Sequence, residues 1–385
     1  GAGDADAAFA KAAKVVRASY DFPYLAHAAM EPMNCVIRLS ADGCEVWNGE
    51  QMHTGDQYAL AGLFGLKPEQ VTIHTLYAGG SFGRRASKDA DYVLEAAHIV
   101  KAINGKISGN PAVKLVWLRE DDMRAGYYRP LFHHALEAAI DADGKLVGWR
   151  HRLVGQSILI GSPFEKMLVK DGIDGVSVEG AANLPYAIPN LKVDLHTPTD
   201  IGVPVLWWRS VGSTHTAFVM ETLIDELAAA TKQDPVAYRL KLMEGNAKAA
   251  HHRAALQAAV AKSGYGQRKL PAGSAWGVAV HESFESVVAY VVVASVKGKG
   301  ADRQVSLHEV HAGVHCGLCV NPKAVEAQVQ GAALMALATT MPGHRITFKD
   351  GVVEQSNFHQ LAMPRIPDMP RVFTVSIVPS SERPT

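Results

Sequence analysis

The residues best suited to bind a charged ligand form one short run, Tyr77–Arg85 (YAGGSFGRR). Three of its residues are glycines, and they lie between an alternating, strand-like segment, residues 71–77, and a segment predicted to be helical. Glycines at such a junction let backbone N–H groups approach an anion closely, and a following helix N-terminus adds a favourable partial charge. Arg84 and Arg85 stand at the same edge. The run predicts a site for a phosphate-bearing or oxyanionic cofactor, or else a tight turn with a solvated arginine pair.

Two further segments carry residues that could act on a ligand. Glu31 and His27 lie in a mostly apolar run, Tyr24–Asn34, where burial would raise the pKa of the carboxylate and suit it to acid or base catalysis. A hydrogen-bonded structural role is the alternative. Arg209 follows two tryptophans, so its guanidinium could bind an oxyanion or stack on an indole.

A group of potential metal ligands, His311, His315, Cys316 and Cys319, lies in the last third of the sequence. On a strand, the two histidines would be about 13 Å apart, at ~3.3 Å per residue, which is too far to share one ion. The cysteine pair supplies two ligands only, and the valine that follows it excludes c-type haem attachment. We therefore expect ordinary buried residues at the end of a strand.

Composition narrows the class of protein. Lysine plus arginine and aspartate plus glutamate both number 38 in 385 residues, so no overall field attracts nucleic acid or an anionic membrane. The longest apolar runs are shorter than the roughly 18 residues of a spanning helix, and no segment after Gly1 resembles a signal peptide. Four cysteines make no disulfide framework, and Cys35 and Cys44 are not placed to pair across their predicted hairpin.

Turn signals and apolar periodicity predict an α+β protein. Hairpins are expected where Asp-Gly turns separate alternating segments: 35–39 with 44–47, 134–140 with 145–154, and 346–348 with 352–354. Further strands are expected at 71–77, 113–118, 276–296, 304–313 and 372–378. Helices are expected at 54–64, capped by Thr54 and ended by Gly65, and at 89–103, 214–231, 251–263 and 323–340, from Asp234-Pro235 onward, and within 4–18. The polar segment 244–274 is predicted to connect two domains, 1–245 and 246–385.

Taken together, the motifs resemble those of a known family: the large, molybdenum-binding subunits of the xanthine dehydrogenase and aldehyde oxidase superfamily, closest to the isoquinoline 1-oxidoreductase and aldehyde dehydrogenase type. The matching segments, in the order of the family, are 27–34 (HAAMEPMN), 79–85 (GGSFGRR), 117–123 (WLREDDM), 208–212 (WRSVG), 277–284 (GVAVHESF), 316–322 (CGLCVNP) with 328–331, and 353–359 (VEQSNFH). The resemblance implies the family's molybdopterin-binding fold with two mixed α/β subdomains.

The resemblance also implies roles for particular residues. Gly80, Ser81, Phe82 and Gly83 would lie at the molybdenum of a molybdopterin cytosine dinucleotide cofactor, with Phe82 walling the substrate pocket. Arg209 would border the oxo side of the metal, and Gln328 would hydrogen-bond the pterin. No side chain would ligate the metal directly. The expected catalytic glutamate would lie beyond Thr385, so the resemblance predicts a C-terminally incomplete second domain and no turnover by this chain alone.

In this family a carbon of an aldehyde or N-heterocycle gains oxygen from water, and electrons pass to 2Fe-2S clusters on a small subunit. Other expected partners are the remaining large-subunit polypeptide and a cytochrome c or another electron acceptor. Ala86 stands where purine-oxidising relatives have a glutamate, and Ser81 and Glu285 replace glycines, so purines are poor substrate candidates. A periplasmic location follows by analogy only, with the cytoplasm as the alternative. Competing functions are a binding or assembly module without molybdenum and a simple binder of phosphate compounds.

Overall fold

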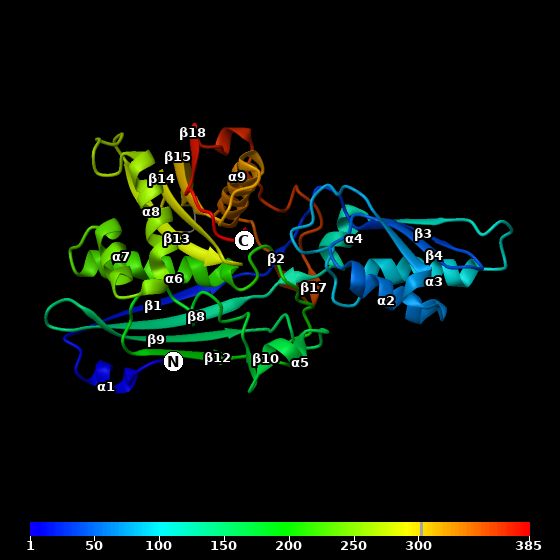
Figure 1. Cartoon of the computed structure of the whole chain (residues 1–385), viewed down its shortest axis with the longest axis horizontal. Helices are drawn as coiled ribbons and strands as arrows, with labels where there is room; N and C mark the ends of the chain where they lie inside the picture. The colour runs from blue at the N-terminus through cyan, green and yellow to red at the C-terminus, as the bar shows by residue number, and fades with distance from the viewer. Residues whose placement is uncertain (301–302) are drawn as a thin grey trace.

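The computed structural model of the chain describes residues 1–300 and 303–385, and these residues contain three four-stranded sheets and three two-stranded ones. Figure 1 shows one lobe, built from β3, β4, α2 and α3, standing apart from a larger body that contains the other two four-stranded sheets. Helices and strands mix throughout, as the α+β prediction requires. No helix of the described residues is long and apolar enough to cross a bilayer.

The first sheet has the order β1-β8-β9-β12, and its strands span Lys14–Phe22, Phe132–Ile140, Leu146–Gly155 and Leu191–His196. The predicted hairpin of β8 and β9 is confirmed, and Asp141 closes its turn by accepting hydrogen bonds from the backbone of Asp143 and Lys145. The prediction of a helix within residues 4–18 holds only for α1, Ala5–Ala10. Beyond it the prediction is wrong, because β1 pairs along its full length with β8.

The separate lobe contains the sheet β5-β4-β3-β6, with strands Val71–Thr75, Cys44–Asn48, Asn34–Leu39 and Val113–Val116. Helices α2, His53–Phe64, and α3, Asp91–Ile103, cover it and bury a core of their own with Cys35 and Cys44, whose thiols are free as predicted. Gly65 ends α2 in the left-handed conformation, as predicted. The predicted cap is wrong, because the helix begins one residue earlier, with Met52 at the N-cap position and no side-chain cap.

The third sheet, β13-β14-β15-β18, has strands Ser274–Ser283, Ser286–Lys297, Gln304–His315 and Val372–Ile377. Helix α8, Ala250–Ser263, packs on one face and α9, Pro322–Thr339, on the other. Side chains alternate along β15: Gly313 lies against Ala255 of α8, whereas Ala312 and Val314 pack toward α9. The two faces of this sheet therefore pack against different helices.

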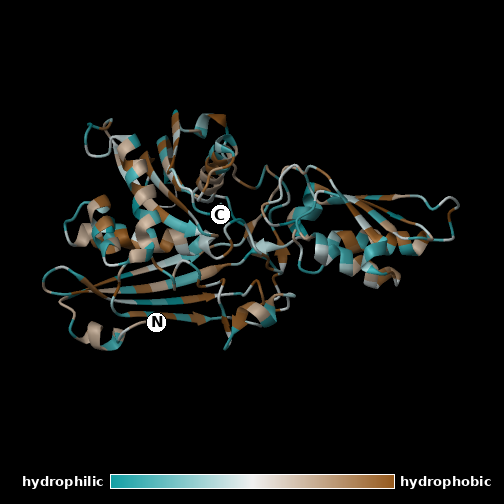
Figure 2. Cartoon of the chain, viewed as in Figure 1, coloured by the Kyte–Doolittle hydropathy of each residue, from teal (hydrophilic) through white to brown (hydrophobic). Residues whose placement is uncertain are grey.

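A single buried cluster joins the first and third sheets. It includes Trp149 of β9, Leu223 of α6 (Ser213–Ala230), Leu256 of α8 and Val291 of β14. Figure 2 shows the apolar and polar residues interleaved along these strands, as expected where one face packs on helices. The prediction that 244–274 is a polar connector is wrong for α8, which contributes to this core. The division of the chain near residue 245 stays a prediction.

Shorter elements connect these layers. They are α4 (Arg119–Arg124), α5 (Glu165–Leu168), α7 (Pro235–Glu244), β2 (Leu25–Ala26), β7 (Tyr128–Arg129), β10 (Val169–Lys170), β11 (Ile173–Asp174), β16 (Phe348–Lys349) and β17 (Val352–Val353), with 3-10 turns at 68–70, 247–249 and 366–368. The Asp234 side chain caps α7 by accepting from two backbone N–H groups, and β16 with β17 forms the predicted third hairpin. Both elements follow from local turn and cap chemistry.

Candidate functional site

The glycine-rich loop lies between β5 and α3 and folds against the segment that holds Arg209. Gly80 and Gly83 have φ values of +95° and +107°, and Phe82 between them is left-handed at +56°. A Cβ atom added at Gly83 would lie 2.6 Å from the carbonyl oxygen of Trp207, so only glycine allows this approach. The loop is thus fixed by its backbone conformation rather than by a regular element.

Arg209 connects three segments that are far apart in the sequence. Its backbone N–H donates to the carbonyl of Phe82 at 2.9 Å, and its Nη2 donates to the Gln328 side chain at 3.1 Å and to the Gln328 carbonyl at 3.2 Å. The residues after it, Ser210 and Val211, are both left-handed, with φ of +71° and +53°. Such strain in non-glycine residues is typical of functional sites. The predicted site residues therefore lie together, while their contacts with a cofactor stay predictions.

The charge of Arg209 is not neutralised by the protein. The side chain is half-buried, burial lowers its pKa, and among the described residues it forms no ion pair with a carboxylate. A guanidinium partly removed from water gains most from an anionic partner. Arg209 is therefore a candidate anion-binding group between the loop and α9.

The arginine pair of the loop has another role. Arg84 and Arg85 are almost fully buried, at 1% and 0% exposure, so the predicted solvated pair is wrong. Arg84 binds Asp91 of α3 at 2.6 Å and lies 3.8 Å from Asp122. Arg85 donates to the Asn48 side chain and to backbone carbonyls. Both guanidinium groups are buried and bind other residues of the protein, so neither is exposed to a ligand, and binding of an anionic cofactor by the loop stays a prediction.

The segment that contains His27 and Glu31 holds both the glycine-rich loop and the segment of Arg209 in place. The Glu31 carboxylate accepts hydrogen bonds from Gly79 N and from the Asn34 side chain, and these lower its pKa. The prediction of a raised pKa and acid or base catalysis is therefore wrong, and the structural alternative holds. His27 lies buried with Nε2 2.9 Å from the Trp207 carbonyl oxygen, and burial lowers its pKa to about 4. Neutral His27 thus donates to the segment that leads into Arg209.

The potential metal ligands in the last third of the sequence differ in their contacts. His311 bonds to Thr374 and Glu309, as expected for a structural residue at a strand, and Cys316 and Cys319 remain free thiols. His315 instead stacks on His251, a contact that the sequence did not predict.

Tyr290 was also missed by sequence reasoning. Its hydroxyl donates to the Val329 carbonyl at 3.0 Å and so holds the turn of α9 that carries Gln328. Burial raises its pKa to about 12, so the hydroxyl stays protonated and remains a donor. Periodicity on β14 could have placed Tyr290 on one face, but its partner on α9 lies 39 residues away.

Comparison with known proteins shows the family to which this chain belongs. A family model described as a molybdopterin cofactor-binding domain matches residues 1–243, and a second model with the same description matches residues 209–370. The chain belongs to the molybdopterin cofactor-binding domain family. Among solved structures, quinoline 2-oxidoreductase from Pseudomonas putida 86 aligns with a TM-score of 0.79 at 13% identity over 97% of this chain and 70% of its own, which confirms the fold.

Relatives in this family include named oxidoreductase subunits. The beta subunit of isoquinoline 1-oxidoreductase from Brevundimonas diminuta is 30% identical over 90% of this chain and 43% of its own length. Membrane-bound aldehyde dehydrogenase of Gluconacetobacter polyoxogenes is 26% identical over 98% of this chain, and a nicotinate dehydrogenase subunit of Pseudomonas putida is 24% identical over 99%. The chain spans 32% to 50% of the length of these three relatives.

The residues of the site fit the cofactor that the family name implies. A molybdopterin carries phosphate and polar ring edges, which call for a cation, close backbone donors and an amide. Arg209 supplies a guanidinium that has no carboxylate partner among the described residues, the loop around Gly80 and Gly83 supplies backbone that approaches without a side chain, and Gln328 supplies an exposed amide. The donor set is therefore suited to an anionic pterin ligand.

Proposed function

We propose that this chain is the cofactor-binding portion of a molybdenum hydroxylase. It would hold molybdenum on a molybdopterin, in the cytosine dinucleotide form, between the glycine loop and α9. One observation carries the proposal: Phe82 binds the backbone of Arg209, Gln328 binds its guanidinium, and that guanidinium has no carboxylate partner among the described residues. Membership of the cofactor-binding family supports it.

The residues of the chain would bind and orient the group. Arg209 would offset negative charge of the cofactor, Gln328 would exchange hydrogen bonds with the pterin, and the backbone of Gly80, Ser81 and Gly83 would border the metal. Phe82, whose ring is half-buried, would wall the substrate pocket and help exclude water. When bound, the cofactor supplies the redox chemistry. No side chain of the loop would need to ligate the metal.

The proposed reaction is oxidation of an aldehyde or hydroxylation of an N-heterocycle with oxygen from water. The names of the relatives support this class, since they include isoquinoline, aldehyde and nicotinate oxidoreductases. We propose that none of the site residues named above accepts the proton. Glu31, the carboxylate next to the loop, is held by Asn34 and Gly79 with a lowered pKa, so it is poorly suited to accept a proton.

The proposed complex extends beyond this chain. A 2Fe-2S small subunit would receive the electrons, the remaining large-subunit polypeptide would complete the site, and a cytochrome c or another acceptor would follow. Two of the relatives are themselves named as subunits, which supports a multi-subunit enzyme. A periplasmic location is proposed by analogy alone.

The test is the metal and pterin content of the full-length protein purified with its partners. Elemental mass spectrometry should find one molybdenum per large subunit, and acid hydrolysis should release one CMP and one pterin. Replacing Arg209 with glutamine should weaken cofactor binding by about 10- to 150-fold and so lower both contents, because a charge-assisted contact contributes about 1.5–3 kcal/mol. Arg17→Gln, at an exposed ion pair, is the matched control. A folded complex that contains neither molybdenum nor pterin would contradict the proposal and favour a binding or assembly module.

A further inference from the structure

Three side chains that the proposed function does not use meet beside the third sheet. His251 comes from α8, His315 ends β15, and Glu382 follows β18. Nε2 of His251 lies 3.1 Å from one carboxylate oxygen of Glu382, and Nε2 of His315 lies 3.8 Å from the same oxygen. The imidazole rings stack with centroids 3.7 Å apart and 12° between their planes. One nitrogen or oxygen of each residue lies within 4.8 Å of the others.

These distances match the spacing of ligands around one ion. Metal–ligand bonds of about 2.1 Å in a tetrahedral zinc site place neighbouring ligand atoms about 3.4 Å apart. The two distances from the Glu382 oxygen, 3.1 Å and 3.8 Å, lie on either side of that value. The spacing of the ligand atoms therefore suits one ion, and the two imidazole rings, which are stacked here, would have to turn so that both lone pairs point at it.

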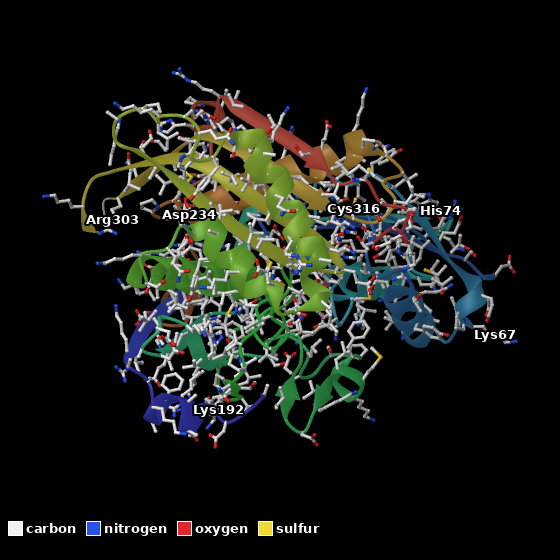
Figure 3. The ribbon with its side chains drawn as sticks, turned by 60° about the vertical axis from the view of Figure 1, so that its left-hand side comes forward. Lys67, His74, Lys192, Asp234, Arg303 and Cys316 are labelled. Carbon is white, nitrogen blue, oxygen red and sulfur yellow. The ribbon has the colours of Figure 1, made fainter. Side chains whose placement is uncertain are left out.

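The cluster is separate from the loop that holds Arg209. His315 and Gly313 lie on the face of β15 that packs against α8. Ala312 and Val314 lie on the opposite face, toward α9 and its Gln328. Cys316, labelled in Figure 3, marks the end of the strand where His315 stands. The sheet itself stands between the two groups of residues.

An open cavity lies next to the three ligands. Its volume is about 670 Å³, and His251, His315 and Glu382 all line it together with Lys248. Zinc sites with three protein ligands keep a fourth position for water or another small ligand. The surroundings therefore suit a site with one exchangeable position.

We propose that His251, His315 and Glu382 bind a first-row divalent transition-metal ion, with zinc as the expected occupant. Two imidazoles and one carboxylate are typical ligands of zinc and its neighbours, whereas magnesium and calcium prefer oxygen ligands throughout. The ion would link α8, β15 and the segment after β18. That segment is already joined to the residues that follow β15 by a hydrogen bond from Leu318 N to the Glu382 carbonyl. The ion would keep one exchangeable position toward the cavity, and its site would be distinct from the molybdenum site.

Zinc binding to the full-length protein tests this proposal. The complex should be purified without a metal-affinity tag, dialysed against a chelator and titrated with zinc chloride in a calorimeter. Wild type should take up one zinc more than the variants His315→Asn and Glu382→Gln, or bind it at least about 100-fold more tightly, since even outer-shell changes cost 10- to 100-fold. His308→Asn, on the same strand but outside the cluster, is the matched control and should bind as wild type does.

Cobalt gives a second readout at the same residues. Cobalt added to the zinc-free protein should produce the visible absorption of a four-coordinate ion, which Glu382→Gln should abolish. Glu382 is 58% exposed, so its change to glutamine should leave the fold intact. The molybdenum content of these variants should equal that of wild type. Equal zinc affinity in wild type and both variants, or no zinc binding at all, would overturn the proposal.

Discussion

Two neighbouring loops carry arginines that differ in whether the protein neutralises their charge. Arg84 and Arg85 of the glycine loop are buried, and Arg84 lies between two carboxylates. Arg209, on the segment that packs against the same loop, is half-buried and binds Gln328 but no carboxylate of the described residues. A charge that the protein already neutralises holds the fold, and one that it leaves uncompensated is available to a ligand. The contrast supports the proposal that the cofactor is bound on the Arg209 side of the loop.

The largest expected loss of stability follows from replacing Arg84, whose charge the protein neutralises. Arg84→Met should lower the free energy of unfolding by about 3–5 kcal/mol, because it leaves Asp91 and Asp122 as buried carboxylates without their cation. Arg17→Met, which removes a cation that is 69% exposed, should cost about 0–1 kcal/mol. Chemical denaturation followed by circular dichroism measures both. Equal losses would remove the distinction between the two kinds of arginine.

A backbone change tests whether the loop must lie against the segment of Arg209. Gly83→Ala should destabilise the protein by about 2–3 kcal/mol, since the new Cβ would meet the Trp207 carbonyl at 2.6 Å in a left-handed conformation. The control is Gly62→Ala in α2, where nothing lies within 4 Å, and it should stabilise by about 0.5–1 kcal/mol. Thermal unfolding would show the opposite signs. A neutral Gly83→Ala would mean that the loop is not held there.

Acidification tests the histidine that anchors the segment of Arg209. Burial lowers the pKa of His27 from 6.5 to about 4, so between these values the unfolded chain binds the proton more readily than the folded one. The contribution of His27 is therefore fully present above pH 6.5 and is lost as the pH falls toward 4. At pH 5 the loss should reach about 2 kcal/mol. Comparing His27→Asn with wild type at pH 7 and pH 5 isolates it, and an identical pH dependence of the two would contradict the assignment.

The smallest effect on stability is expected at the uncompensated arginine. Arg209→Gln should change the free energy of unfolding by less than about 1.5 kcal/mol, the range of one ordinary hydrogen bond. The same substitution should strongly reduce bound molybdenum in the full-length protein. A loss of stability as large as that of Arg84→Met would show that Arg209, too, serves the fold.

Local turn chemistry allowed much of the fold to be predicted from the sequence. The hairpins follow from Asp-Gly turns such as Asp143-Gly144, and α7 follows from a capping aspartate before a proline. The errors have two causes. Val15 and Val16 are β-branched and already favour the strand that pairs with β8, so the helix prediction gave too much weight to the alanines. Helix α8 looks polar but buries Ala255 and Leu256, which depends on its tertiary contacts.

The site was predictable by resemblance rather than by spacing. Arg209 and Gln328 are 119 residues apart, and no local pattern announces that they will touch. The burial of Arg84 and Arg85 depends on partners such as Asp122 and Asn48, which come from other elements. The cluster of His251 and Glu382 could not be predicted either, because these residues are 131 positions apart in the sequence.

The position of molybdenum in the full-length protein tests the central claim most directly. Anomalous diffraction at the molybdenum absorption edge, from crystals of the purified complex, would locate the metal without assumptions about the cofactor. We predict one peak in the space bounded by the loop of Phe82, the Arg209 side chain and Gln328. A peak elsewhere on this chain, or none there in a protein shown to contain molybdenum, would contradict the account.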